Sequence, residues 1–224
     1  MDNKGDGAMT GTEDDLRLAQ LLCSRICHDL VGSAGAVNAG LELLTDGDTL
    51  DDAALHLAIG SGAELANRLA FFRVAFGAGG AGRDGADLRA LRTLAINYFG
   101  AGQVALDWPA EDQSPGAGFT VVLGRLLLNL VLIANECLPR GGTVSVRLAA
   151  LAGGVGLAVS AEGAGAKLRE DVARAMTPRT AVSDLDSRNV HGLVVQLLVV
   201  SAECELEVAQ EDGSVRFAAI VENG

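Results

Sequence analysis

The sequence predicts an α+β protein made of an N-terminal antiparallel helical hairpin followed by a C-terminal α/β sandwich. Two apolar stripes with helical spacing, separated by the short turn-rich segment TDGDTLDD, predict the hairpin. The glycine-rich stretch GAGGAGRDG at 77–85 then interrupts this pattern, and strand-like alternation follows it. We therefore divide the chain into a disordered tail at 1–12, a hairpin domain at 13–78, a linker at 79–86 and an α/β domain at 87–224.

The composition narrows the classes of protein to which the chain can belong. Of its 224 residues, 49% are apolar, which is enough for a packed core, and the formal net charge is −12. Because no cluster of lysine or arginine appears, we expect no nucleic-acid partner. The four cysteines form no CxxC pair, so the sequence predicts neither a zinc site nor a disulfide framework.

The N-terminal segment does not predict targeting to a membrane. It is polar and acidic, without the charged-then-apolar order of a signal peptide. The longest apolar run, near 126–134, is too short to cross a bilayer. We therefore expect a cytoplasmic protein without a membrane partner.

The hairpin is predicted from two apolar stripes, the first of which follows acidic residues that begin near Thr12, a common helix-start signal. Gly32 and Gly35 predict a bend in the first helix. A two-helix hairpin cannot bury both of its apolar faces alone, so we expect two copies to dimerise into a four-helix bundle. The first stripe consists of Leu18, Leu22, Ile26, Leu30, Ala34, Val37, Leu41 and Leu44, and the second of Leu55, Ile59, Gly62, Ala66, Leu69, Phe72 and Phe76.

The part of the chain after the linker alternates between helical and strand patterns. Two of the strand patterns are joined by a Gly-Gly turn, as in a β-hairpin. Helices grouped with consecutive hairpin strands predict helices on one face of a mixed or antiparallel sheet. We expect helices at 88–99, 120–138, 167–176 and 190–202, and strands at 103–108, 143–150, 155–161, 205–210 and 214–221.

His28 is the candidate catalytic residue, and it lies on the first helix but outside its apolar stripe. At about 100° per residue, it is placed roughly 200° around the helix from both Ile26 and Leu30. A side chain in this position is expected to face solvent. An imidazole has a free nucleophilic nitrogen near neutral pH, so it can accept a phosphoryl group without a dedicated base. Asp29 follows directly and is expected to orient or support the ring.

The residues around His28 are candidates for contacts with a partner protein. Ser24 and Gly32 lie one helical turn away on the same face, and Arg25 and Val31 flank it. Gly32 would leave room for another protein's active site to approach the imidazole. The alternative interpretation of His28 is an ordinary exposed histidine on a helix.

The segments CHDLVGS at 27–33 and AVNAGLELL at 36–44 carry a resemblance to a known family. Together with Arg25, they resemble the phosphoacceptor segment of the ChpT-type histidine phosphotransferases of alphaproteobacteria. That family has an R-x-C-H-D motif, a patch of small residues and then N-x-G-L-E-L-L. The sequence departs from this pattern at Ala34, where a proline commonly stands.

The resemblance implies a homodimer in which His28 is displayed on the surface of a four-helix bundle. It also implies that the histidine accepts a phosphoryl group from the receiver domain of a hybrid histidine kinase and donates it to response regulators. In that chemistry the receiver supplies the aspartate and the Mg²⁺, so no tightly bound cofactor or metal is expected on this chain. The phosphotransferase supplies the histidine and a docking surface.

The C-terminal domain resembles a histidine-kinase ATPase domain that has lost its nucleotide site. The helix that would carry two asparagines four residues apart has Asn129 but Ile133 in the second position. The aspartate of the D-x-G-x-G motif is replaced by Ala161, and only one glycine of the phosphate loop remains, beside His191. We expect His191 to be a remnant or a residue at the edge of the core.

Two alternatives to phosphotransfer remain open from the sequence. The chain could be a non-catalytic dimeric docking module for response regulators, a kinase relic without a phosphoryl group of its own. An ATP-dependent histidine kinase is a further alternative, which Ile133 and Ala161 disfavour because the metal ligand and the adenine partner are missing.

Overall fold

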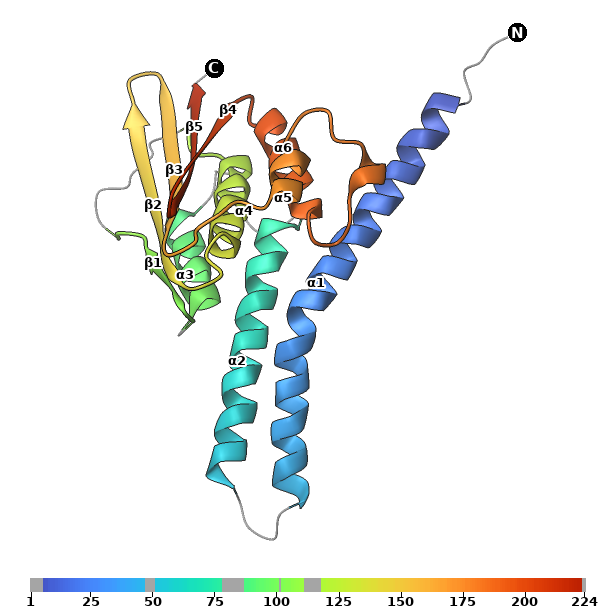
Figure 1. Ribbon diagram of the computed structural model, residues 1–224, viewed down its shortest axis with the longest axis vertical. Helices are drawn as coiled ribbons and strands as arrows, with labels where there is room; N and C mark the ends of the chain where they lie inside the picture. Colours follow the sequence, from blue (N-terminus) through green and yellow to red (C-terminus); the bar gives the residue numbers. More distant parts are fainter. Residues whose placement is uncertain (1–5, 47–50, 78–86, 101, 111–117, 223–224) are drawn as a thin grey trace.

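The structure is a computed structural model that describes residues 6–46, 51–77, 87–100, 102–110 and 118–222. Two long helices, α1 (Asp6–Asp46) and α2 (Asp52–Ala75), form an antiparallel hairpin that extends away from the rest of the molecule (Figure 1). Residues 6–12 belong to α1, so the predicted tail at 1–12 is helical from Asp6 onward. The predicted linker at 79–86 lies outside the described residues.

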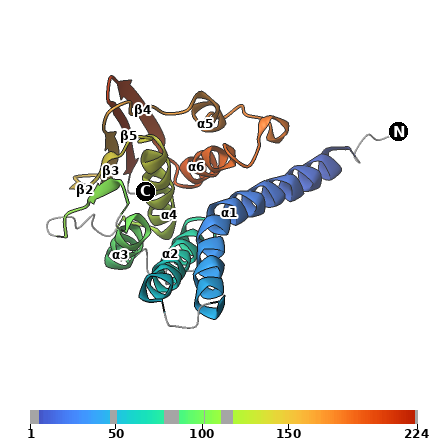
Figure 2. The ribbon, with the colours of Figure 1, turned by 60° about the horizontal axis from the view of Figure 1, so that its bottom comes forward.

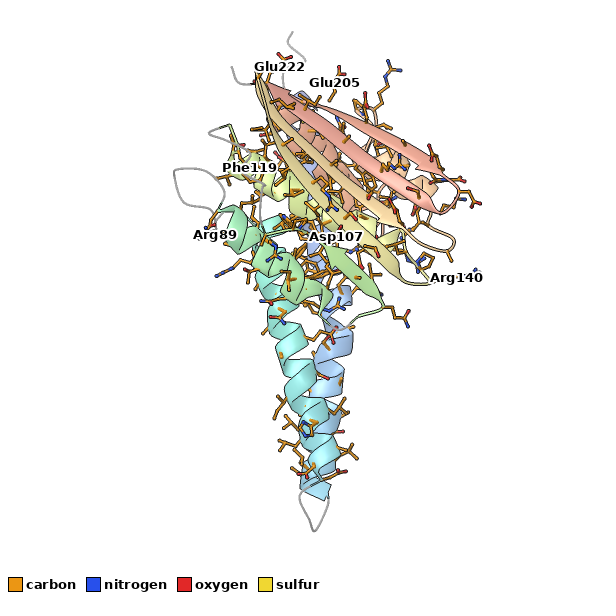
Figure 3. All side chains as sticks on the ribbon, turned by 90° about the vertical axis from the view of Figure 1, so that its left-hand side faces the viewer. Arg89, Asp107, Phe119, Arg140, Glu205 and Glu222 are labelled. Carbon is orange, nitrogen blue, oxygen red and sulfur yellow. The ribbon has the colours of Figure 1, made fainter. Side chains whose placement is uncertain are left out.

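The second part of the chain is a mixed five-stranded sheet with helices on one face, which confirms the predicted α+β class. The strand order is β1-β2-β3-β5-β4, with β1 parallel to β2 and the other neighbours antiparallel. Figure 3 looks onto the opposite face of the sheet, which α4 and α6 leave uncovered. The elements are α3 (Leu88–Phe99), β1 (Val104–Asp107), α4 (Val121–Glu136), β2 (Gly142–Leu151), β3 (Gly154–Glu162), α5 (Glu170–Ala175), the short 3₁₀ helix η1 (Val182–Asp184), α6 (Val190–Ser201), β4 (Glu205–Glu211) and β5 (Ser214–Glu222).

The two helices of the hairpin approach each other closely at Gly40. A Cβ atom at this position would lie 2.9 Å from the backbone oxygen of Ala54 and 2.9 Å from the backbone nitrogen of Ala58. Only glycine fits there without moving one helix. The helix α1 is continuous and changes direction about midway along its length (Figures 1 and 2), in keeping with the bend expected from its glycines.

The hairpin and the sheet share one hydrophobic core, although the sequence predicted two separate units. The centre of this core is α4, which is buried along most of its length between the sheet and the end of α2. Phe71 and Phe72 of α2 pack into the same cluster, and Tyr98 of α3 stacks on Phe71 with ring centroids 4.3 Å apart. The hairpin is therefore fixed to the α/β domain by continuous packing.

The N-terminal half of α1 packs on the α/β domain of its own chain. Leu18 and Leu21 contact a small cluster formed by α5, α6 and the segment around η1. Leu22, Ile26 and Leu30 pack against the main core. The first half of the predicted stripe is thus covered within one chain.

The free end of the hairpin, in contrast, leaves large apolar side chains in solvent. The exposed members on α1 are Leu41 and Leu43, and those on α2 are Leu55, Leu57 and Ile59. Exposed apolar side chains gathered in this way are unusual on a monomeric protein. Among the described helices, none is long and apolar enough to cross a membrane.

Candidate functional site

His28 stands on the outer face of α1, as its position off the apolar stripe predicted. Its side chain is 84% exposed. The ring Nδ1 lies 3.4 Å from Oδ1 of Asp29, while Nε2 has no hydrogen-bond partner among the described residues. This arrangement favours a proton on Nδ1 and a free lone pair on Nε2.

Three of the four predicted docking residues surround His28 on the same accessible surface. Ser24 is exposed and Val31 is 65% exposed. A Cβ atom added to Gly32 would meet nothing within 4 Å, so the helix surface next to the imidazole is open. These positions are free to contact a partner.

Arg25 differs from its prediction as a docking residue, because its side chain turns inward and is buried at the junction of the two domains. Only 8% of the residue is exposed. Its guanidinium pairs with Glu136 at the end of α4, and its Nε donates to Oδ2 of Asp29 over 2.8 Å. Its Nη1 lies 3.0 Å from Nδ1 of His191 and 3.3 Å from the backbone oxygen of Arg188.

His191 is fully buried at the start of α6, between Arg25 and Glu136. A guanidinium can only donate hydrogen bonds, so Nδ1 of His191 acts as the acceptor and the ring proton lies on Nε2. That Nε2 atom is 3.1 Å from Oε2 of Glu136. The histidine expected as a remnant or core-edge residue is instead part of a polar network inside the protein.

The electrostatics of this network favour a charged carboxylate on Glu136. Burial by itself would raise the pKa of Glu136, but His191 and Arg25 outweigh this effect and hold the pKa below its usual range. For Arg25, burial by itself would lower the pKa. The negative charges of Glu136 and Asp29 outweigh this effect and raise the pKa above its usual value. The Arg25–Glu136 ion pair is therefore maintained at neutral pH.

A hollow of about 780 Å³ lies beside His28, and the α/β domain forms part of its wall. The hollow is lined by His28 and Asp29 from α1 and by Arg169, Ser187 and Arg188 from the α/β domain, with Arg25 and Glu136 below. Among the described residues, the Arg188 side chain has no ion-pair partner, whereas Arg169 pairs with Asp171.

Sequence reasoning missed the residues that the α/β domain contributes to this site. One signal for Glu136 was available, because an acidic side chain in the last turn of a helix is unfavourable beside the helix dipole and needs a cation. Arg25 and Asp29 are also spaced as an i, i+4 ion pair. Nothing in the sequence placed Arg169 or Arg188 near His28.

Asn129, Ile133 and Ala161, the residues that the resemblance to a kinase places at a nucleotide site, are all buried. The side-chain amide of Asn129 is buried and donates to the backbone oxygens of Ala75 and Arg125, each over 2.9 Å. Ile133 and Ala161 are buried in the apolar core. No three metal-ligating side chains gather among the described residues.

The fold and the site together define a protein in which a helical hairpin presents one exposed histidine beside an α/β domain. The sequence profile of the family described as histidine phosphotransferase C-terminal domain matches residues 88–214, which is more than half of the chain. The chain belongs to this family. The resemblance that the segment 25–44 indicated is thereby confirmed.

Two relatives support this assignment. The chain is 40% identical over 137 residues to a protein of Brucella abortus named protein phosphotransferase ChpT, a match that covers 59% of this chain and 61% of the relative, less than two thirds of it. A solved structure described as a bacterial phosphotransferase superposes with a TM-score of 0.75 at 29% identity, covering 91% of this chain and 96% of that one. The histidine kinase domain of a blue-light activated kinase from Erythrobacter litoralis is more distant, with a TM-score of 0.46 at 17% identity over 94% of this chain and 93% of that one.

Proposed function

We propose that this protein relays a phosphoryl group through His28 between the receiver domains of a two-component phosphorelay. The observation that carries the proposal is the exposed imidazole, with Nδ1 turned toward Asp29 and Nε2 free. A phosphoacceptor histidine needs this combination, because the attacking nitrogen must be both unprotonated and accessible to another protein. Membership of the phosphotransferase family supports the same conclusion.

In the transfer step, the lone pair of His28 Nε2 attacks the phosphorus atom of a receiver's aspartyl phosphate. The N–P bond forms while the P–O bond to the aspartate breaks, and the aspartate leaves as a carboxylate. The proton on Nδ1 stays on the ring, where Asp29 stabilises the positive charge that develops. Transfer to a second receiver is the reverse of this step.

The partners in this proposal are the receiver of a hybrid histidine kinase and the receivers of response regulators. Arg188, whose side chain has no ion-pair partner among the described residues, gives the hollow beside His28 a basic rim on the side of the α/β domain, in a chain whose net charge is −12. A basic rim complements the acidic surroundings of a phosphorylated aspartate and favours rapid encounter. Mg²⁺ would be supplied by the receiver. All four cysteines are free thiols, which supports relay in the reducing cytoplasm.

The relay protein would act as a homodimer. The exposed apolar side chains at the free end of the hairpin, among them Leu57 and Ile59, supply a surface for a second copy. Two hairpins joined through this surface form a four-helix bundle and leave His28, which lies nearer the α/β domain, accessible.

A docking module without phosphotransfer is the second candidate, and the same exposed surface would serve it. ATP-dependent kinase activity is disfavoured because the Asn129 amide is engaged by backbone oxygens and Ile133 and Ala161 offer no ligand. The docking module differs from the relay only in whether His28 carries a phosphoryl group.

The deciding experiment measures transfer of a radiolabelled phosphoryl group from receiver domains, phosphorylated on aspartate with labelled acetyl phosphate, to the full chain. We expect the wild type to acquire an acid-labile label and His28→Gln to acquire none. His56→Gln is the matched control, because His56 is also exposed and lies on α2, and it should be labelled like the wild type. A wild type that docks receivers but takes no label would leave the docking module as the function.

A further inference from the structure

The polar network around Arg25 joins the two domains immediately below the phosphoacceptor. Arg25 is three residues before His28 on α1, and its guanidinium contacts groups from α4, from α6 and from the backbone just before α6. The same guanidinium also holds Asp29, which in turn faces the ring of His28. One buried side chain thus connects the α/β domain with the residue that faces the reactive histidine.

The contacts of Arg25 are directional, unlike the apolar packing around them. Leu22, Ile26 and Leu30 attach the same stretch of α1 to the α/β domain through apolar packing, which favours burial but tolerates sliding. A guanidinium carries its donors in a fixed planar fork, so its acceptors must occupy defined positions. Arg25 satisfies four different acceptors at once.

The position of the α/β domain against α1 determines the shape of the surface around His28. Arg169, Ser187 and Arg188 belong to the α/β domain, whereas His28 and its exposed neighbours belong to α1. A receiver that contacts both α1 and the α/β domain can bind only when the α/β domain keeps a fixed position relative to α1. The backbone oxygen of Arg188 is itself a ligand of Arg25, so the arginine is tied directly to this wall of the hollow.

We infer that Arg25 is a positioning residue for phosphotransfer: it fixes the α/β domain against the phosphoacceptor helix and so assembles the two-domain surface on which a receiver docks. The inference rests on the proposed function. Arg25 does not contact the phosphoryl group, and the nucleophile is complete without it. Its removal should therefore weaken docking of the receiver and leave the intrinsic reactivity of His28 intact.

The test separates docking from chemistry by using two phosphodonors on the full chain. A phosphorylated receiver domain needs the assembled surface, whereas phosphoramidate, a small molecule, needs only the exposed imidazole. For Arg25→Met we expect the receiver concentration at half-maximal transfer to rise about tenfold or more, with labelling by phosphoramidate unchanged within about twofold. Arg25→Lys restores the charge without the fork and should recover part of the loss.

Two further variants isolate the contact between the domains. Glu136→Leu removes the charged acceptor on α4 but leaves Arg25 paired with Asp29, and we expect about a threefold rise in the half-maximal receiver concentration. Arg17→Met is the matched control on the same helix, because Arg17 reaches only two backbone oxygens, at 3.3 and 3.5 Å, from the exposed edge of the interface. It should behave like the wild type within about twofold.

Each outcome decides the inference. Folded Arg25→Met and Glu136→Leu variants that bind and transfer like the wild type would overturn it, and if Arg25→Met does not fold, Glu136→Leu decides alone. An equal loss with both donors would also overturn it, because Arg25 would then act on His28 through Asp29. A wild type that takes label from phosphoramidate but from no receiver refutes the proposed function itself, and the inference with it.

Discussion

Arg25 and His28 lie three residues apart in α1, yet their side chains occupy opposite environments. His28 is 84% exposed, whereas Arg25 is 8% exposed and lies among Glu136, Asp29 and His191. A buried guanidinium is stable only when its donors are paired, and here the pairs come from three separate segments of the chain. The exposed histidine therefore lies next to a buried polar network that joins α1 to the α/β domain.

The acid sensitivity of the fold should depend in part on Glu136. Because folding holds the pKa of this carboxyl below its unfolded value, the unfolded chain binds more protons in acid. The contribution of Glu136 to stability is thus complete at neutral pH and is lost as the pH falls below about 4.5 and through the depressed value. We expect urea unfolding between neutral pH and about pH 3.5 to show a smaller loss of stability in Glu136→Leu than in the wild type.

The exposed carboxylate of Asp107 provides the control for this measurement. Its pKa is also lowered, first by the hydrogen bond from Arg147, but solvent screens that pair. Asp107→Asn should therefore lose stability in acid as the wild type does. If Glu136→Leu loses as much stability in acid as the wild type and Asp107→Asn do, the role assigned to Glu136 is contradicted.

The sequence predicted the exposed residues of the site better than the buried ones. Helical periodicity in α1 was enough to place His28, Val31 and Gly32 outside, because exposure follows from the angle to the apolar stripe. The same angle left Arg25 among the docking residues, because its partners come from α4 and α6, more than a hundred positions along the chain. Contacts of that separation are set by tertiary packing and leave no local pattern.

At the level of elements, the hairpin depends on small residues where its helices approach. Gly40 of α1 faces Ala54 and Ala58 of α2, with no room for a Cβ atom. Gly32 and Gly35, one to two turns earlier, face open space. The glycines of α1 thus differ in role. Gly40 allows close approach of α2, whereas Gly32 and Gly35 lie where no helix is near.

Substitution of these glycines by alanine should have opposite effects on the free energy of unfolding. Gly35→Ala removes backbone freedom from the unfolded chain without a clash and should stabilise by up to about 1 kcal/mol. Gly40→Ala forces α1 and α2 apart and should destabilise by about 1–3 kcal/mol. Chemical denaturation of both variants measures the difference, and equal stabilisation by the two would show that the helices do not pack closely at Gly40.

Most of the elements were predictable from sequence because periodicity and turn residues are local signals. Helix α3 was predicted with its observed bounds, and the strands that become β2 and β3 were predicted as a pair across a Gly-Gly turn. The start of α1 was placed too late, since residues 6–12 carry no apolar stripe. Local composition indicated a tail there, yet these residues continue the helix.

At the scale of the whole molecule, one core extends through the hairpin and the α/β domain while the free end of the hairpin remains unpaired. The sequence indicated a boundary after α2, but Phe71, Phe72 and α4 pack across it. The apolar side chains left over gather at the far end of α1 and α2. The α/β domain therefore supports one end of the hairpin, and a second copy is expected to support the other.

Dimerisation should be lost when a charge is placed at that end. Ile59 is 61% exposed in the single chain, and Ile59→Lys would bury an unpaired ammonium group in the expected four-helix bundle. Sedimentation equilibrium should show a dimer for the wild type and a monomer for this variant. Val200→Lys is the control, because Val200 is 63% exposed on α6, away from the free end of the hairpin, and it should remain dimeric. If Ile59→Lys and Val200→Lys have the same molecular mass in solution, the two copies do not associate through the free end of the hairpin.

The amide of Asn129, which donates to backbone oxygens at the end of α2 and within α4, also bears on which substitutions this domain can tolerate. Positions 133 and 161 are likewise buried in the apolar core, so a polar side chain at either one would be surrounded by hydrocarbon. Each such replacement on its own would bury an unsatisfied polar group at a cost of about 1–3 kcal/mol, or more for a charge. The centre of the α/β domain is therefore expected to accept apolar substitutions far more readily than polar ones.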